Sequence, residues 1–243
     1  MTRRYVAFDI ETAKILPELA GDLLAHRPLG IACAAAVFSD SDKAVTWHGV
    51  ADGKPSARMS HHEVRSLVRD LSEHVHNGYT LLSWNGLSFD LNILAEESGL
   101  PHECAALARR HVDMMFHVVC QLGYYIALAK AAEGLGLPGK SVGVTGYNAP
   151  IMWAEGKHAE VIQYNVQDAR LSLAIARESE RRGELVWVTR KGTKSRMPIA
   201  KGWHNVEEAH ALPLPDTSWM SDPPRREKFT NWFPQDVTGR GDG

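Results

Sequence analysis

The sequence predicts an α/β fold, a mixed β-sheet flanked by helices, with a β-hairpin and an extended arm at the C-terminus. Apolar runs rich in β-favouring residues open the chain, and strand-like and helix-like segments alternate after them. Residues 156–182 lack Gly and Pro in their interior and read as one long helix. At 243 residues and 44% hydrophobic content the chain can bury one full core. We therefore expect one domain, residues 1–183, followed by an extension, residues 184–243.

The first strand is predicted from the apolar run of residues 5–8. Side chains alternate along a strand, so Asp9 and Glu11 share one face while Phe8 and Ile10 share the other. Two carboxylates about 7 Å apart on one face repel each other unless a cation lies between them. An Asp-x-Glu pair also occurs at solvated strand ends, so the pair alone does not identify a site.

Two further strands and a helix follow. The strands are predicted over residues 30–38 and 44–48, with a turn at residues 39–42 between them. Residues 60–76 read as a helix, because apolar residues recur there at helical spacing. These are Val64, Leu67, Val68 and Leu71.

A second acidic segment follows the strand predicted over residues 79–84. Asn85-Gly86 ends that strand, Ser88 is the expected N-cap, and Asp90 opens a helix. One alternative is that Asp90 only complements the helix dipole, an effect worth about 0.3–1 kcal/mol. Residues 111–115 are expected to form another strand, in which Asp113 is interpreted as structural.

The third acidic segment lies on the long helix, which Gly183 should end. Tyr164 and Asp168 are four residues apart and therefore share one helix face. A buried tyrosine beside a surface acid is the alternative for this pair alone. The three segments in this order, each at the end of a suitable element, favour a common site.

The three segments together resemble the DEDD superfamily of 3′–5′ exonucleases in its tyrosine-containing (DEDDy) form. The resemblance covers about residues 4–182 and implies a ribonuclease H-like fold, similar to the proofreading exonuclease domain of family B polymerases. It implies that Asp9 bridges two Mg²⁺ or Mn²⁺ ions and that Glu11 and Asp168 complete one of these sites. Asp90 would support the second ion through water, and Tyr164 would orient the attacking water.

The same resemblance implies a substrate and contacts to it. The substrate would be single-stranded nucleic acid, shortened from its 3′ end to nucleoside 5′-monophosphates. Thr12, Trp84 and Asn85 are expected to contact it. The site residues do not decide whether the substrate is DNA or RNA, because that discrimination depends on contacts to the sugar. A non-catalytic nucleic-acid-binding or scaffold protein on the same fold is the alternative, although all five site residues are intact.

The C-terminal extension is predicted to begin with a basic hairpin, residues 184–189 and 195–199. Its connection carries Arg190, Lys191 and Lys194, which could contact nucleic acid or form a solvated tip. Beyond residue 212 the chain is rich in Pro and contains Trp219 and Trp232. These aromatics predict an arm packed on the domain, and residues 238–243 should be loose.

Composition and other motifs exclude several classes of protein. The net charge of −2 gives no global attraction to nucleic acid, so any positive surface must be local. No apolar run reaches membrane-spanning length and no signal peptide opens the chain. We expect a cytoplasmic protein with reduced, buried cysteines. These are Cys33, Cys104 and Cys120.

Two further patterns are misleading. Residues 134–141 match the nucleotide-binding Walker A pattern, but a helix former precedes them and a loop follows, the reverse of a working P-loop. The twelve histidines lack the spacing of a zinc site. Those at positions 61, 62, 74, 76 and 102 are expected at the surface or at helix ends.

Overall fold

A five-stranded mixed sheet forms the centre of the computed structural model, which describes residues 3–17, 21–139 and 144–235. The strand order is β3-β2-β1-β6-β7. The bounds are β1 Tyr5–Thr12, β2 Ile31–Phe38, β3 Ala44–His48, β6 Thr80–Ser83 and β7 Val112–Asp113. β2 runs antiparallel to β1 and to β3, whereas β6 pairs parallel with both β1 and β7. The carboxyl ends of β1, β6 and β7 therefore meet at one edge of the sheet.

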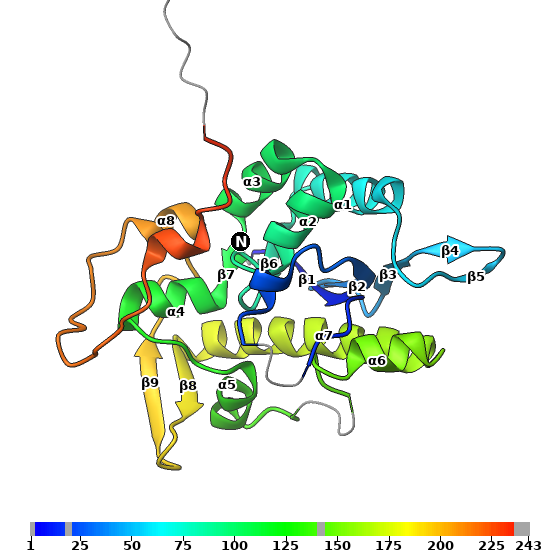
Figure 1. The fold of residues 1–243 in the computed structure, drawn as a ribbon. Coiled ribbons are helices and arrows are strands. Elements are labelled where there is room, and N and C mark those ends of the chain that lie inside the picture. The colour runs from blue at the N-terminus through cyan, green and yellow to red at the C-terminus, as the bar shows by residue number, and fades with distance from the viewer. Residues whose placement is uncertain (1–2, 18–20, 140–143, 236–243) are drawn as a thin grey trace, which may run out of the picture.

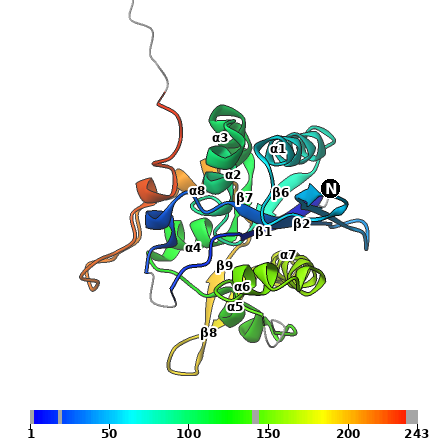
Figure 2. The same ribbon diagram turned by 45° about the vertical axis from the view of Figure 1, so that its right-hand side comes forward.

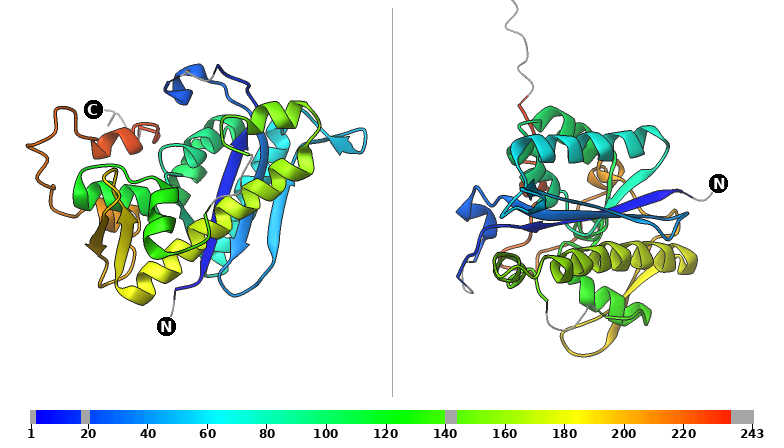
Figure 3. Two further views of the ribbon diagram at one scale, coloured as in Figure 1. Left: turned by 90° about the horizontal axis from the view of Figure 1, so that it is seen from below. Right: turned by 90° about the vertical axis from the view of Figure 1, so that its right-hand side faces the viewer.

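Helices cover both faces of this sheet (Figure 1). One face carries α1 (His61–His76), α2 (Asp90–Ser98) and α3 (Pro101–Arg110). The opposite face carries α7 (His158–Arg182), which packs across β1 and β2, together with α5 (Leu128–Leu135) and α6 (Ala149–Ala154). Figure 2 and the right panel of Figure 3 show the sheet between these two helical layers. The predicted α/β architecture with a mixed sheet is confirmed.

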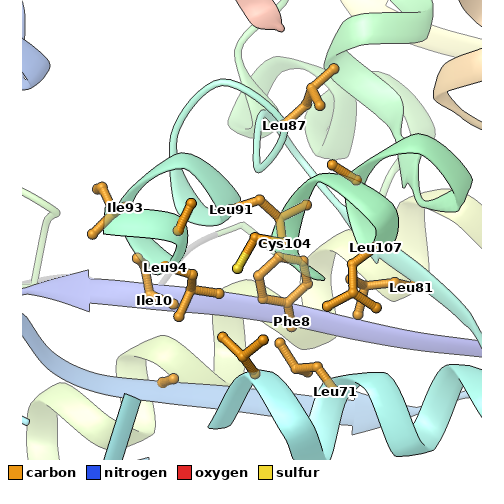
Figure 4. Packing of buried hydrophobic residues seen from close by; sticks show 14 of the residues in the cluster. Phe8, Ile10, Leu71, Leu81, Leu87, Leu91, Ile93, Leu94, Cys104 and Leu107 are labelled. Atoms are coloured by element: carbon orange, nitrogen blue, oxygen red, sulfur yellow. The ribbon is translucent and has the colours of Figure 1, made fainter. Parts of the chain in front are cut away.

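The alternation of β1 decides which side chains enter which layer. Phe8 and Ile10 are buried among residues of α1, α2 and α3, as Figure 4 shows. Tyr5 and Ala7 are buried in a second core with residues of α7 and α5. Asp9 and Glu11 lie on the same side of the strand as Tyr5 and Ala7, and so face the layer that contains α7.

Local sequence signals predicted some of the helix ends correctly and one of them wrongly. Ser60 and Glu63 form a capping box at the start of α1, and Gly183, at φ 73°, ends α7 as predicted. The expected Ser88 cap of α2 is wrong. Phe89 occupies the N-cap position without a side-chain bond, and the Ser88 hydroxyl donates to Asn85 Oδ1 at 2.9 Å. The positive φ of Asn85, 73°, turns the chain so that Ser88 points back into the loop.

The strand expected over residues 111–115 is shorter than predicted. Only β7, two residues long, is extended, and α4 (Met114–Leu122) begins directly after it. The Asp113 carboxylate accepts a hydrogen bond from the Phe116 backbone N–H at 3.1 Å and thereby caps α4. An aspartate in this position favours helix initiation over a longer strand.

The predicted hairpin is present as β8 (Glu184–Val188) and β9 (Lys194–Pro198), which pair antiparallel. It packs on α5, where Gly134 makes the contact possible: a Cβ at this glycine would lie 2.3 Å from Trp187 Cα. Gly136 then ends α5 in the left-handed conformation, φ 74°. Of the Walker A pattern, Gly134 therefore lies within α5 and Gly136 ends it. Lys140 and Ser141 lie outside the described residues.

Smaller elements complete the chain. They are η1 Leu23–His26, β4 Val50–Ala51, β5 Lys54–Pro55, α8 Val206–His210 and η2 Arg226–Phe229. Among the described residues, no helix is both long and apolar enough to cross a bilayer. All three cysteines are buried and form no disulfide.

The C-terminal arm packs on the domain. Phe229 lies against Phe116 with ring centroids 5.1 Å apart, and Trp232 Nε1 donates to the Leu87 carbonyl at 2.8 Å. The buried Arg226 guanidinium donates to four backbone carbonyls. Trp219 differs from the expectation of a packed aromatic, because 67% of its surface is exposed. Residues 238–243, expected to be loose, lie outside the described residues.

Candidate metal centre and active site

Three carboxylates from two elements converge between β1 and α7. Asp9 and Glu11 come from the end of β1, and Asp168 comes from the facing side of α7. Each offers a carboxylate oxygen within 4.8 Å of the others. Glu11 and Asp168 are only 5% and 6% exposed. The structure therefore brings together three of the four acids named from the sequence, and this group could hold a divalent cation.

Asn165 is a member of this site that the sequence did not identify as functional. Its Nδ2 donates to Asp9 Oδ2 at 2.7 Å, and the residue is fully buried. The position offers a signal in hindsight, because Asn165 lies three residues before Asp168 and hence on nearly the same helix face. This amide holds Asp9 in one orientation.

Tyr164 lies beside the acids, as its spacing from Asp168 predicted. It is 4% exposed. Burial raises the pKa of the Tyr164 hydroxyl most, and the negative charges of Asp168 and Glu11 and a hydrogen bond to Asp168 raise it further. The hydroxyl therefore stays protonated at neutral pH and acts as a donor rather than as a base.

Asp90 is buried just beyond the end of β6, at the same sheet edge. Its Oδ1 accepts a hydrogen bond from the Ile10 backbone N–H at 3.0 Å, between the two acids of β1. Burial raises the pKa of Asp90 to about 7, and the negative charge of Asp113 adds to this increase. Asp90 is not part of the three-carboxylate group, and the indirect role implied for it stays a prediction.

The loop that carries Asp90 is held by Asp113. The Asp113 carboxylate accepts hydrogen bonds from the backbone N–H groups of Asn85 and Leu87 at 2.9 and 2.8 Å. Gly86 is required in this loop, because a Cβ there would lie 2.4 Å from Ser83 Oγ. The interpretation of Asp113 as structural is therefore supported by its contacts.

The expected substrate-binding residues fall into two groups. Thr12 follows a register shift between β1 and β2 directly after Glu11, and Trp84 and Asn85 form the loop before Asp90. The second group, Arg190, Lys191 and Lys194, lies on the hairpin that follows α7. Arg190 lines a cavity to which none of the three clustered acids contributes. A substrate contact for each group stays a prediction.

The described histidines form no metal site. The carboxylate group is the one set of three or more potential metal ligands found in the part of the chain that the structure describes. The side chains of His61, His62, His76 and His102 are exposed and that of His74 is partly buried, all on helices. The predicted surface and helix-end placement is confirmed.

Comparison with known proteins agrees with this architecture. A family model described as the RNase H superfamily matches residues 35–178, more than half of the chain. The match includes Asp90, Tyr164 and Asp168, and it begins after β1. No curated protein matches the chain. RNase H-like nucleases generally use divalent metal ions, in keeping with the carboxylates between β1 and α7. The chain belongs to the RNase H superfamily.

Proposed function

We propose that this protein is a metal-dependent 3′–5′ exonuclease of the tyrosine-containing DEDD type. It would hydrolyse phosphodiester bonds of single-stranded DNA or RNA and release nucleoside 5′-monophosphates. The observation that carries the proposal is the convergence of Asp9, Glu11 and Asp168 within 4.8 Å, with Tyr164 against Asp168. Superfamily membership supports a nuclease in general, and the acids and the tyrosine favour this type.

The acid cluster fits Mg²⁺ or Mn²⁺. Two unit charges 4.8 Å apart repel by roughly 3 kcal/mol at an effective dielectric constant of about 20. A divalent cation relieves this repulsion, and hard carboxylate oxygens are the ligands that Mg²⁺ and Mn²⁺ prefer. Two such ions, when bound, supply an activated water and stabilise the leaving oxygen of a phosphodiester. Asp9, Glu11 and Asp168 would hold the first ion, and Asp90 would support the second.

The protein groups around the acids orient the reactants. Tyr164 is held by its hydrogen bond to Asp168, so its position beside the carboxylates suits it to orient the attacking water. Asn165 keeps one Asp9 oxygen in place by donating to it. The Ile10 N–H fixes Asp90 in the same way. The clustered acids favour an enzyme over the non-catalytic alternative, because a bound divalent cation would offset their mutual repulsion and supply the chemistry of hydrolysis.

The test is hydrolysis of 5′-labelled single-stranded DNA and RNA with Mg²⁺, Mn²⁺ or EDTA. We expect a stepwise ladder with either metal and none with EDTA. Asp9→Ala and Asp168→Ala should each lower turnover about a thousandfold or more, on the order of 4 kcal/mol in the barrier. Asp42→Ala, which removes an exposed acid outside the cluster, is the matched control and should retain full activity.

Substrate ends test the direction of the reaction. A 3′-phosphate adds negative charge beside the carboxylates, so a 3′-phosphorylated strand should resist degradation. A circular single strand should resist as well. Full activity of Asp9→Ala or Asp168→Ala would contradict the metal assignment, and cleavage of the circle would contradict the exonuclease assignment.

A further inference from the structure

A cavity to which the acid cluster does not contribute lies where α4, α5, the β8–β9 hairpin and the C-terminal arm meet. Its volume is about 690 Å³, and four aromatic side chains line it. They are Tyr124, Tyr125, Trp187 and Trp219. Figures 1 and 2 show the hairpin projecting beside α5, on the side of the sheet that carries α7. We call this space the aromatic cavity.

Two of these aromatic side chains are exposed to an unusual degree. Tyr125 is 56% and Trp219 67% exposed, and only Tyr147 joins them as an exposed large aromatic residue in the described chain. The Trp219 ring stands edge-on to Tyr124, with centroids 6.2 Å apart, and Tyr124 is placed similarly against the buried Trp187. Partly fixed rings with accessible surface are suited to stacking against a flat aromatic ligand.

Positive charge lies at the same cavity. Lys130 and Arg190 both line it. Lys130 forms a salt bridge with Glu133 at 2.7 Å, which compensates its charge. Within the described residues the Arg190 side chain forms neither a salt bridge nor a hydrogen bond, and Lys191 and Lys194 follow on the same hairpin. Aromatic rings together with an uncompensated guanidinium favour a ligand that is both aromatic and anionic, as a nucleotide is.

The sheet connects the aromatic cavity to the acid cluster. Met115 lines the cavity and comes two residues after Asp113, the last residue of β7. The carboxyl end of β7 lies at the same sheet edge as those of β6 and β1. Two strand spacings, about 10 Å, separate β7 from β1 along that edge. A single-stranded nucleic acid whose 3′ end lies at the carboxylates can therefore extend along this sheet edge toward the aromatic cavity.

We propose that the aromatic cavity binds one or two bases of the single-stranded substrate, several nucleotides from its 3′ end, and that Arg190 contacts a neighbouring phosphate. This inference rests on the proposed function for the identity of the ligand. It assigns a purpose to the exposed Trp219 and to Arg190 of the basic hairpin, which both line a cavity that none of the three clustered acids lines.

Binding of oligonucleotides without turnover tests the proposal. Fluorescence anisotropy in EDTA would measure the affinity of the full chain for labelled single strands, from a dinucleotide to a dodecamer, in DNA and RNA series. Trp219→Ala and Tyr125→Ala should each weaken dodecamer binding about 5- to 100-fold, as for the loss of one stacked base, and leave dinucleotide binding unchanged. Trp219→Phe should restore most of the affinity.

Two further variants sharpen the result. Arg190→Ala should lower the slope of log affinity against log salt by about 0.7. Leu214→Ala, which removes an exposed apolar side chain of the same arm outside the aromatic cavity, is the matched control and should bind as wild type. Cross-linking of 5-iodouracil placed at successive positions would report how far from the 3′ end a base meets Trp219.

The outcomes separate the two proposals. If Trp219→Ala and Tyr125→Ala both bind the dodecamer as tightly as wild type does, the proposed role of the aromatic cavity is wrong, even if the enzyme degrades single-stranded nucleic acid. An equal loss for dinucleotide and dodecamer overturns its placement away from the 3′ end. Length-dependent loss in a protein that shows no metal-dependent hydrolysis would support the cavity and refute the exonuclease.

Discussion

Replacing Asp90 by Asn should stabilise the metal-free protein at alkaline pH. Asp90 is 5% exposed, and burial raises its pKa from 3.8 to about 7. The hydrogen bond from the Ile10 N–H opposes this increase but does not cancel it. Asparagine has nearly the same shape, keeps an oxygen for the Ile10 N–H and cannot ionise. The substitution therefore removes the cost of burying a charge and little else.

The size and sign of the effect follow from proton linkage. An acid with a raised pKa in the folded state keeps its proton where the unfolded chain has lost it, so its contribution makes stability fall as pH rises from 3.8 to about 7. A difference of about 3 pKa units corresponds to roughly 4 kcal/mol. Asp90→Asn should gain up to this amount near pH 8, and the gain should vanish toward pH 4.

Urea unfolding in EDTA, followed by tryptophan fluorescence over this pH range, measures the difference between variant and wild type. Contributions from titrating groups that do not interact with Asp90 cancel in that difference. Asp42→Asn, at an exposed site, should show no pH-dependent difference. Saturating Mg²⁺ should reduce the difference in stability between Asp90→Asn and wild type, because a cation favours the charged carboxylate of the wild type. A stability difference that is the same at every pH, or a variant less stable than wild type near pH 8, would refute the reasoning.

Three further substitutions test individual contacts. Tyr164→Phe should lower turnover by about 10- to 1000-fold with little change in substrate binding, because it removes a single positioned hydroxyl; equal losses of binding and turnover would make the tyrosine structural. Asn165→Leu should weaken Mn²⁺ binding in calorimetry by about 10-fold, since the donor to Asp9 is lost, and unchanged affinity would remove Asn165 from the site. Arg226→Met should cost about 2–5 kcal/mol in unfolding free energy, because four backbone carbonyls, among them the buried carbonyl of Cys120, lose their donor. Trypsin should then cleave the C-terminal arm faster than it cleaves the domain. An arm as resistant to trypsin as in wild type would contradict the stabilising role of Arg226.

The sequence alone determined the features that depend on neighbours along the chain. Alternation in β1 separated Asp9 and Glu11 from Phe8 and Ile10, since strand geometry depends only on local backbone dihedrals. The long helix, its end at Gly183 and the hairpin after it were predictable for the same reason. The spacing of Tyr164 and Asp168 also placed them on one face, and the structure puts both beside Glu11.

Only the tertiary structure decided the contacts between distant segments. Asn165 reaches Asp9 across 156 positions, and Trp232 reaches Leu87 across 145. No periodicity encodes such pairs, because they depend on how α7 and the arm pack on the sheet. The raised pKa of Asp90 has the same origin, since burial is a property of the assembled layers. The aromatic cavity also exists only after α4, α5, the hairpin and the arm come together, because residues from all four line it.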